Sequence, residues 1–107
     1  MNETTTPARR QSPRVKVDAT VRFARDHEQE SGDAIDIGLG GMRIGAKKSL
    51  AVGETTVVML RIASSRPIPF SGVVRWADAR TFGIQFAPLS ALQLRTIVEV
   101  LKRARVL

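Results

Sequence analysis

The sequence predicts a small, mainly β domain, an antiparallel β-barrel of about six strands with one C-terminal α-helix. Three observations lead to this prediction. Apolar and polar residues alternate in several short segments between residues 15 and 87, which is the two-residue period of a half-buried strand. Turn-forming residues separate these segments. Only the last stretch changes to helical spacing, and a chain of 107 residues has room for one hydrophobic core.

The first half of the domain begins with the clearest strand. Residues 15–23 place an apolar side chain at every second position. The next segment, RDHEQESGD (residues 25–33), is charged and ends in Gly-Asp, so it predicts a loop or hairpin connection with His27 as a solvated loop residue. Residues 34–37 and 42–46 then predict two short strands joined through glycines.

The second half repeats the strand pattern after a turn at KKSLAVGE. Alternating apolar residues, many of them β-branched or aromatic, predict three further strands. These are residues 54–63, 68–78 and 81–87. In this phase Trp76 shares the apolar face of its strand with Val74, and we expect it to pack in the core or at its rim.

The helix is predicted over residues 90–105. Ser90 and Gln93 have the spacing of a capping box, in which each side chain binds the other residue's backbone N–H. The apolar stripe expected to face the barrel consists of Leu94, Ile97, Val98 and Leu101. The cations of the last turns, Lys102, Arg103 and Arg105, complement the helix dipole.

The composition narrows the possible functions. The chain has no cysteine and one histidine, which excludes disulfides and thiolate metal sites, and no catalytic Ser-His-Asp set can be assembled. We therefore expect a protein without catalytic activity, metal or cofactor. Its 17 lysines and arginines against 10 acids give a formal charge of +7, which favours anionic partners. Neither a leader nor a membrane span of about 20 apolar residues is evident, so a cytoplasmic protein is expected.

Two short motifs carry the functional prediction. RRQSPR places Arg10 and Arg14 four residues apart just before the first strand, and DIGLGG places Asp36 five residues before Gly41. Together they resemble the PilZ domain, whose family pattern is RxxxR before the first strand and D/N-x-S-x-x-G between later strands. The late stretch SGVVRWADARTFGIQFAPLS also looks like the family's strand pair and C-terminal helix. The resemblance covers roughly residues 9–105. Residues 1–8 (MNETTTPA) are polar and without periodicity, which predicts a flexible tail before one domain over 9–107.

The resemblance implies a bacterial receptor for the second messenger cyclic di-GMP, acting as an adaptor on an unidentified protein partner in motility, pilus or exopolysaccharide control. The implied ligand-binding residues are Arg10, Arg14, Asp36, Gly38 and Gly41, with Arg9 as a possible auxiliary. The chemistry is compatible. Arginines pair with phosphate and with guanine O6 and N7, and an ionised carboxylate accepts hydrogen bonds from guanine N–H groups. Glycine at 41 would let ligand and backbone approach closely or permit a positive φ.

One departure from the pattern keeps an alternative open. Gly38 stands where the family has serine, so a hydroxyl near the guanine is missing, which costs about 0.5 to 1.5 kcal/mol of binding free energy. The alternative is a PilZ-like interaction module that does not bind the nucleotide. In that case Arg10 and Arg14 are a solvated basic tail and Asp36 accepts turn N–H groups. A third hypothesis, nucleic-acid binding, explains the charge, but the aromatic residues are expected in the core. Both monomer and homodimer are compatible with the sequence.

Overall fold

The computed structural model describes residues 14–63 and 65–104. This part of the chain consists of six strands followed by one helix. The elements are β1 (Arg14–Arg25), β2 (Glu28–Gly38), β3 (Gly41–Ala46), β4 (Thr55–Ile62), β5 (Ile68–Ala77), β6 (Thr81–Phe86) and α2 (Ala91–Ala104). The tail predicted over residues 1–8 and the candidate residues Arg9 and Arg10 lie outside the described residues, as does Arg105.

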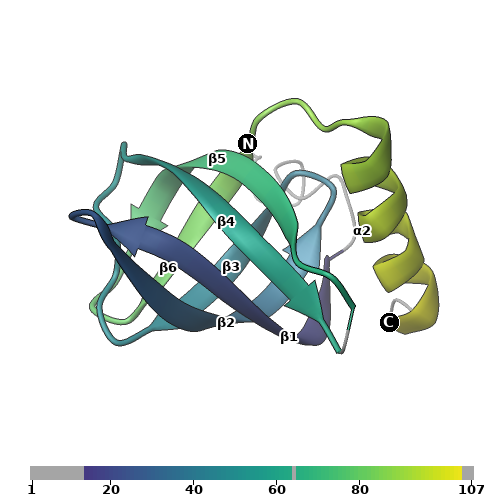
Figure 1. The fold of residues 1–107 in the computed structure, drawn as a ribbon, viewed down its shortest axis with the longest axis horizontal. Helices are drawn as coiled ribbons and strands as arrows, with labels where there is room; N and C mark the ends of the chain where they lie inside the picture. Colours follow the sequence, from purple (N-terminus) through teal and green to yellow (C-terminus); the bar gives the residue numbers. More distant parts are fainter. Residues whose placement is uncertain (1–13, 64, 105–107) are drawn as a thin grey trace, which may run out of the picture.

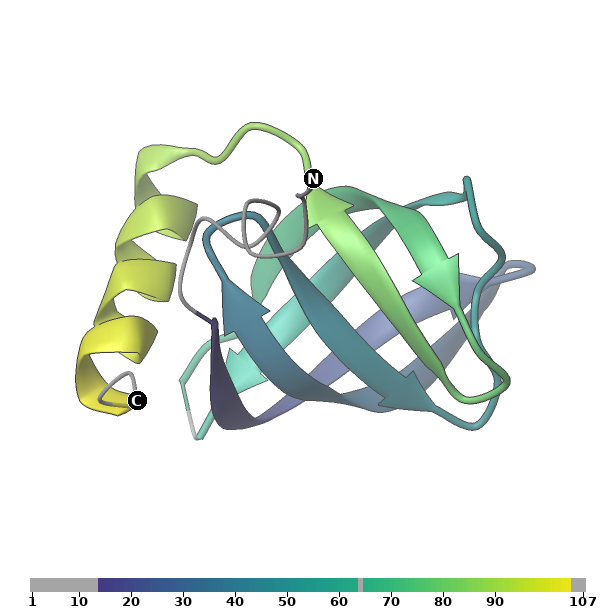
Figure 2. The same ribbon diagram turned by 180° about the vertical axis from the view of Figure 1, so that it is seen from behind.

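The strands close into a barrel in the order β1-β2-β3-β6-β5-β4, and all neighbouring strands are antiparallel. Helix α2 lies at one end of this barrel, beside the start of β1 and the turn between β2 and β3 (Figures 1 and 2). The predicted antiparallel barrel with a C-terminal helix is confirmed. Arg14, the last residue of the first motif, and the second motif around the β2–β3 turn therefore lie at the helix end of the barrel.

The core follows from the alternation seen in the sequence. Inward-facing positions of all six strands are apolar, and three phenylalanines, Phe23, Phe70 and Phe82, are fully buried among them. The rings of Phe23 and Phe82 meet edge to face with their centroids 5.5 Å apart. Full burial of one such side chain stabilises the fold by about 1.5 to 3 kcal/mol.

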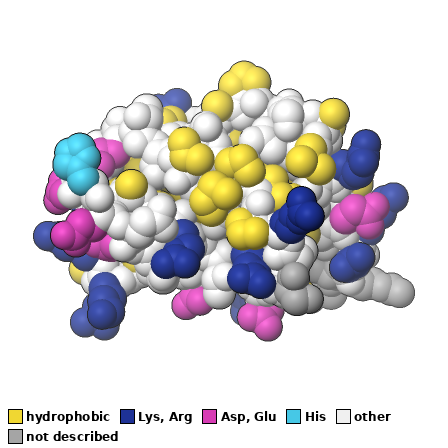
Figure 3. Space-filling model, viewed as in Figure 1, with side chains coloured by type: hydrophobic (Ala, Val, Ile, Leu, Met, Phe, Trp, Pro, Cys, Tyr) yellow, Lys and Arg dark blue, Asp and Glu magenta, His cyan; other side chains and the backbone are white. Residues whose placement is uncertain are grey.

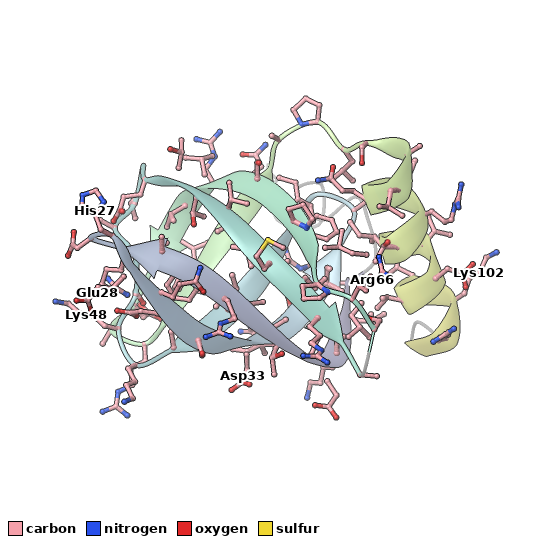
Figure 4. All side chains as sticks on the ribbon, in the orientation of Figure 1. His27, Glu28, Asp33, Lys48, Arg66 and Lys102 are labelled. Atoms are coloured by element: carbon pink, nitrogen blue, oxygen red, sulfur yellow. The ribbon has the colours of Figure 1, made fainter. Side chains whose placement is uncertain are left out.

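The connection predicted over residues 25–33 is mostly strand, which corrects the sequence prediction. β2 begins at Glu28, and only Asp26 and His27 form the turn. Both turn residues have positive φ, 49° and 71°, as in the two-residue type I′ hairpin. The inward positions of β2 here are Gly32, opposite the buried Val21, and Glu30, opposite the buried Phe23. Neither is an apolar side chain, so apolar and polar residues do not alternate in this part of β2. Figure 4 places His27 at the end of the barrel away from α2.

The side chain of Trp76 does not face the core, although the alternation in β5 predicts that it does. β5 pairs with β6 as Val74↔Ile84 and then as Trp76↔Gly83, so two residues of β5 advance against one of β6. This β-bulge turns the indole outward, where 41% of Trp76 is exposed. The predicted position on the core face is wrong for this residue, although the predicted strand is present.

The helix begins where the capping box placed it. The Ser90 N–H donates to Gln93 Oε1 at 2.7 Å, and the Gln93 N–H donates to Ser90 Oγ at 3.2 Å. The buried positions are Ile97 and Val100, whereas Leu94 is 45% exposed, so the stripe that faces the barrel is rotated from the predicted one. No helix within residues 14–63 and 65–104 is long and apolar enough to cross a membrane.

Candidate functional site

Four of the six candidate residues are described, and they come from three adjacent strands. Arg14 is the first residue of β1, Asp36 and Gly38 lie at the end of β2, and Gly41 begins β3. These positions surround the β2–β3 turn at the barrel end that faces α2 (Figure 2). The fold thus brings Arg14 of the first motif next to Asp36 of the second, although the two are 22 residues apart in the sequence.

Asp36 is held by two arginines. Arg14 Nε donates to Asp36 Oδ1 at 3.2 Å, and Arg14 Nη2 lies 3.0 Å from the same oxygen. Arg43 Nη2 lies 3.0 Å from the other oxygen, Oδ2. The Asp36 side chain is only 18% exposed, so the two guanidinium groups compensate a carboxylate that is largely withdrawn from water. The three groups together carry one net positive charge.

Strand register explains how the cluster forms. Arg43 is directly opposite Asp36 in the β2–β3 ladder. Arg14 is opposite Gly38 in the β1–β2 ladder and reaches diagonally to Asp36, two residues away on the same face of β2. Arg43 was missed from the sequence because its contact depends on this register, and the only local signal is its place in the second motif's hairpin.

Gly41 has a structural role that differs from the expected one. Its φ is not positive, so of the two expected reasons for glycine here, left-handed backbone does not apply. A Cβ atom at this position would collide with the carbonyl oxygen of Ile84 on β6. Gly40 differs, because a Cβ there would meet nothing within 4 Å. Gly41 therefore lets β3 and β6 approach each other.

Gly38 is buried at the end of β2, beside Arg14. Directly opposite residues of an antiparallel pair have Cβ atoms about 5 Å apart. A serine at this position would consequently place its hydroxyl next to the Arg14 side chain. The departure from the family pattern thus lies inside the cluster of Arg14 and Asp36 rather than at a distance from it.

An exposed aromatic residue lies on the same outer face. The cross-strand partners Asp36, Arg43, Gly83 and Trp76 form one row across β2, β3, β6 and β5. The Trp76 indole covers Gly83, since a Cβ on Gly83 would meet the indole ring. Neighbouring strands are about 4.8 Å apart, so Trp76 begins roughly 10 Å from Arg43. Sequence alternation assigned Trp76 to packing and did not place it near the motif.

A second feature of the surface lies over β4 and β5. The outward residues Thr55, Val57, Ser71 and Val73 of β4 and β5 are uncharged, and Val57 is 52% exposed. They line a shallow hollow of about 650 Å³ together with Arg75. Figure 3 shows hydrophobic side chains gathered on this face, with lysines and arginines around them. Among the described residues no group of His, Cys, Asp and Glu is arranged to hold a metal ion.

Comparison with known proteins gave concordant results. A family model described as the PilZ domain matches residues 8–103. The fold resembles the structure "PilZ domain with c-di-GMP of YcgR" from Escherichia coli, with a TM-score of 0.79, 13% identity, and coverage of 90% of this chain and 91% of that one. A search of curated proteins returned no match.

Two longer proteins also contain this fold. One is the Bacillus subtilis inhibitor of motility MotI/DgrA, with a TM-score of 0.73, 20% identity, and coverage of 89% of this chain and 50% of that one. The other is MrkH of K. pneumonia, with a TM-score of 0.66, 20% identity, and coverage of 97% of this chain and 51% of that one. The chain thus spans about half the length of each of these two structures.

Proposed function

The chain belongs to the PilZ domain family, and we propose that it is a cyclic di-GMP receptor without catalytic activity that acts on a protein partner. One observation carries the proposal. Arg14 and Asp36, which match the arginine and acidic positions of the two family motifs, lie in contact at the surface of the barrel, at 3.0 Å. The similar structure from Escherichia coli is described with this nucleotide, which supports the same ligand class here.

The chemistry of the nucleotide suits these side chains. Cyclic di-GMP carries two phosphates and two guanines. Arg14, whose side chain is 30% exposed, can pair with a phosphate or with guanine O6 and N7. Asp36 can accept hydrogen bonds from the guanine N1–H and exocyclic amine. Arg9 and Arg10, outside the described residues, are proposed to add phosphate contacts, and the exposed face of Trp76 is available to stack on a purine.

The proposed output is a contact with a partner protein in the bacterial cytoplasm. The nucleotide would be held between the motif arginines and the Asp36 turn and so create a new surface next to α2. The hollow over β4 and β5, lined by Val57, Val73 and Arg75, offers a second surface on which a protein could dock. A role in motility, pilus or exopolysaccharide control is supported by the description of one similar structure as an inhibitor of motility.

A second candidate function is a PilZ-like interaction module that does not bind the nucleotide. The observation that favours it is Gly38, which leaves the position opposite Arg14 without a hydroxyl. In that case the contacts of Asp36 with Arg14 and Arg43 would be a structural ion-pair cluster that stabilises the β2–β3 hairpin.

Calorimetric titration of cyclic di-GMP into the purified protein at moderate salt tests the proposal. Arg14→Ala removes a charged contact worth about 1.5 to 3 kcal/mol, so we expect binding to weaken by roughly 10- to 100-fold. Gly38→Ser is expected to strengthen binding by about tenfold or less. Arg22→Ala removes the same charge from an exposed position on the outer face of β1 and serves as the control.

The outcomes separate the two functions. Saturable binding that Arg14→Ala weakens and Arg22→Ala leaves within about twofold supports the receptor. Equal losses in both variants would instead indicate general charge attraction, which salt suppresses. No heat with the wild-type protein, and binding only in Gly38→Ser, would mean that the fold is retained with a disabled site.

A further inference from the structure

We propose that Arg43 is a positioning residue of the nucleotide site, which holds the Asp36 carboxylate in place when Arg14 turns from Asp36 to the nucleotide. This inference rests on the proposed function and deepens it. Three features of the cluster carry it. They are the division of the two carboxylate oxygens between the arginines, the different anchoring of the two arginines, and the burial of Arg43 Nε.

The two arginines use different oxygens of the same carboxylate. Both contacts of Arg14 go to Asp36 Oδ1, at 3.0 and 3.2 Å, whereas Arg43 contacts Oδ2 at 3.0 Å. Departure of Arg14 would therefore free one oxygen completely and leave the other occupied. The freed oxygen would be an acceptor of fixed direction, which is what recognition of a guanine N–H edge requires.

The two arginines are also anchored differently. Arg43 lies in the middle of a ladder, paired with Asp36 on β2 and with Gly83 on β6. Arg14 is the first residue of β1 and is paired with β2 alone, because the described pairing of β1 with β4 begins at Ala19. Arg14 is thus the partner whose movement disturbs fewer backbone hydrogen bonds.

One side of the Arg43 guanidinium is withdrawn from water, although the side chain as a whole is 42% exposed. Its Nε is buried, and it has no hydrogen-bond partner within the part of the chain that the structure describes. A buried donor without a partner is uncommon, so the contact of Nη2 with Asp36 is the polar contact that orients this group within the described residues. A nucleotide on the surface cannot reach this nitrogen, so it does not compete for it.

Electrostatics then explains why two arginines are needed for one acid. A carboxylate that is only 18% exposed is costly to leave without a cation. If Arg14 were the single partner, its transfer to a phosphate would leave Asp36 uncompensated, and binding would be weakened by that cost. With Arg43 on Oδ2, the charge of Asp36 stays compensated in both states.

Arginine Nε–Hε resonances test the inference without any nucleotide. The Arg14→Ala protein imitates the departure of Arg14. We expect the Arg43 resonance to keep its wild-type chemical shift and its slow hydrogen exchange, because its Nε is buried and its contact with Asp36 is independent of Arg14. A displaced or rapidly exchanging Arg43 resonance in this protein would overturn the inference.

Addition of cyclic di-GMP to the wild-type protein provides the second readout. We expect the Arg14 resonance to move and the Arg43 resonance to stay. By calorimetry, Arg43→Gln is expected to weaken binding by about tenfold, and Arg43→Lys to restore most of the affinity, because an ammonium can still occupy Oδ2. Arg22→Gln, which removes the same charge from the outer face of β1, should leave affinity within about twofold.

The results distinguish failure of this inference from failure of the proposed function. Binding accompanied by equal movement of the Arg14 and Arg43 resonances would overturn the positioning role and make Arg43 a direct contact. Equal losses in Arg43→Gln and Arg22→Gln would reduce its role to general charge and would also overturn it. If cyclic di-GMP produced no heat and no resonance shift in the wild-type protein, the receptor function would be refuted. The Arg14→Ala measurement would still decide whether Arg43 holds Asp36 by itself.

Discussion

The change Gly41→Ala is expected to destabilise the barrel even though it adds a single methyl group. The added Cβ would collide with the Ile84 carbonyl oxygen, and it would also lie 3.2 Å from the carbonyl carbon of Ile84 and 3.4 Å from the Cα of Gln85. All three are backbone atoms of β6, so no side chain can rotate away to make room. β3 and β6 would have to separate at the pair Gly41↔Gln85.

The size of the effect follows from the cost of overpacking, which is about 1 to 3 kcal/mol. For a domain of this size, each kcal/mol lowers the melting temperature by about 4 to 8 °C, so we expect a decrease of roughly 5 to 20 °C. Gly40→Ala is the matched control, because a Cβ at that position meets nothing within 4 Å and φ is not positive. It should be neutral, or stabilising by about 0.4 to 1 kcal/mol through the unfolded state.

Thermal unfolding followed by circular dichroism, with both variants and the wild type in one buffer without nucleotide, measures the difference. Equal melting temperatures for Gly41→Ala and Gly40→Ala would refute the packing role of Gly41. The glycine would then have to be explained by approach of a ligand, as the motif alone suggests. A large decrease for Gly41→Ala alone would mean that this motif position is needed by the fold whatever the protein binds.

Three further predictions concern the turn, the helix cap and the tryptophan. His27→Gly should raise the free energy of unfolding by about 1 kcal/mol in urea titration, because φ is 71° at His27 and glycine adopts this region without strain. Ser90→Ala should lower it by about 0.5 to 2 kcal/mol in the same titration through loss of the cap. Gly83→Ala should displace the indole of Trp76, the chain's single tryptophan, and shift its fluorescence emission to longer wavelength; an unchanged spectrum would contradict the packing of the ring on Gly83.

Much of the fold could be predicted because apolar and polar residues alternate in most of the strands that line the barrel core. The prediction was wrong where this alternation is absent or changes phase. In residues 28–33 the inward positions of β2 are Glu30 and Gly32, which lie opposite buried residues of β1 but are not apolar, so the segment resembles a loop in sequence. A β-bulge between Val74 and Trp76 reverses which side chains of β5 face the core. No residue in IPFSGVVRWAD indicates this bulge from the sequence. The exposed Leu94 shows the same limit for the helix, because its rotation is decided by the barrel surface it meets.

The candidate site was partly predictable for a related reason. Arg14 and Asp36 belong to motifs that can be recognised along the chain, whereas the contact of Arg43 with Asp36 exists only through the register of β2 and β3. A one-residue slip of that ladder would move Arg43 to the inner face of the sheet. Cross-strand partners of this kind become visible only when the pairing is known.

The motif residues differ in how strongly they argue for nucleotide binding. Gly41 is required by the approach of β6, so a barrel that had lost its ligand would still need it. Asp36 is compensated by two arginines and can persist as a structural ion pair. Gly38, by contrast, pairs with Arg14 at the point where the family has a hydroxyl. The choice between a receptor and a nucleotide-independent module therefore depends on the pair Arg14 and Gly38, and variants at these two positions carry more information than variants at the rest of the motif.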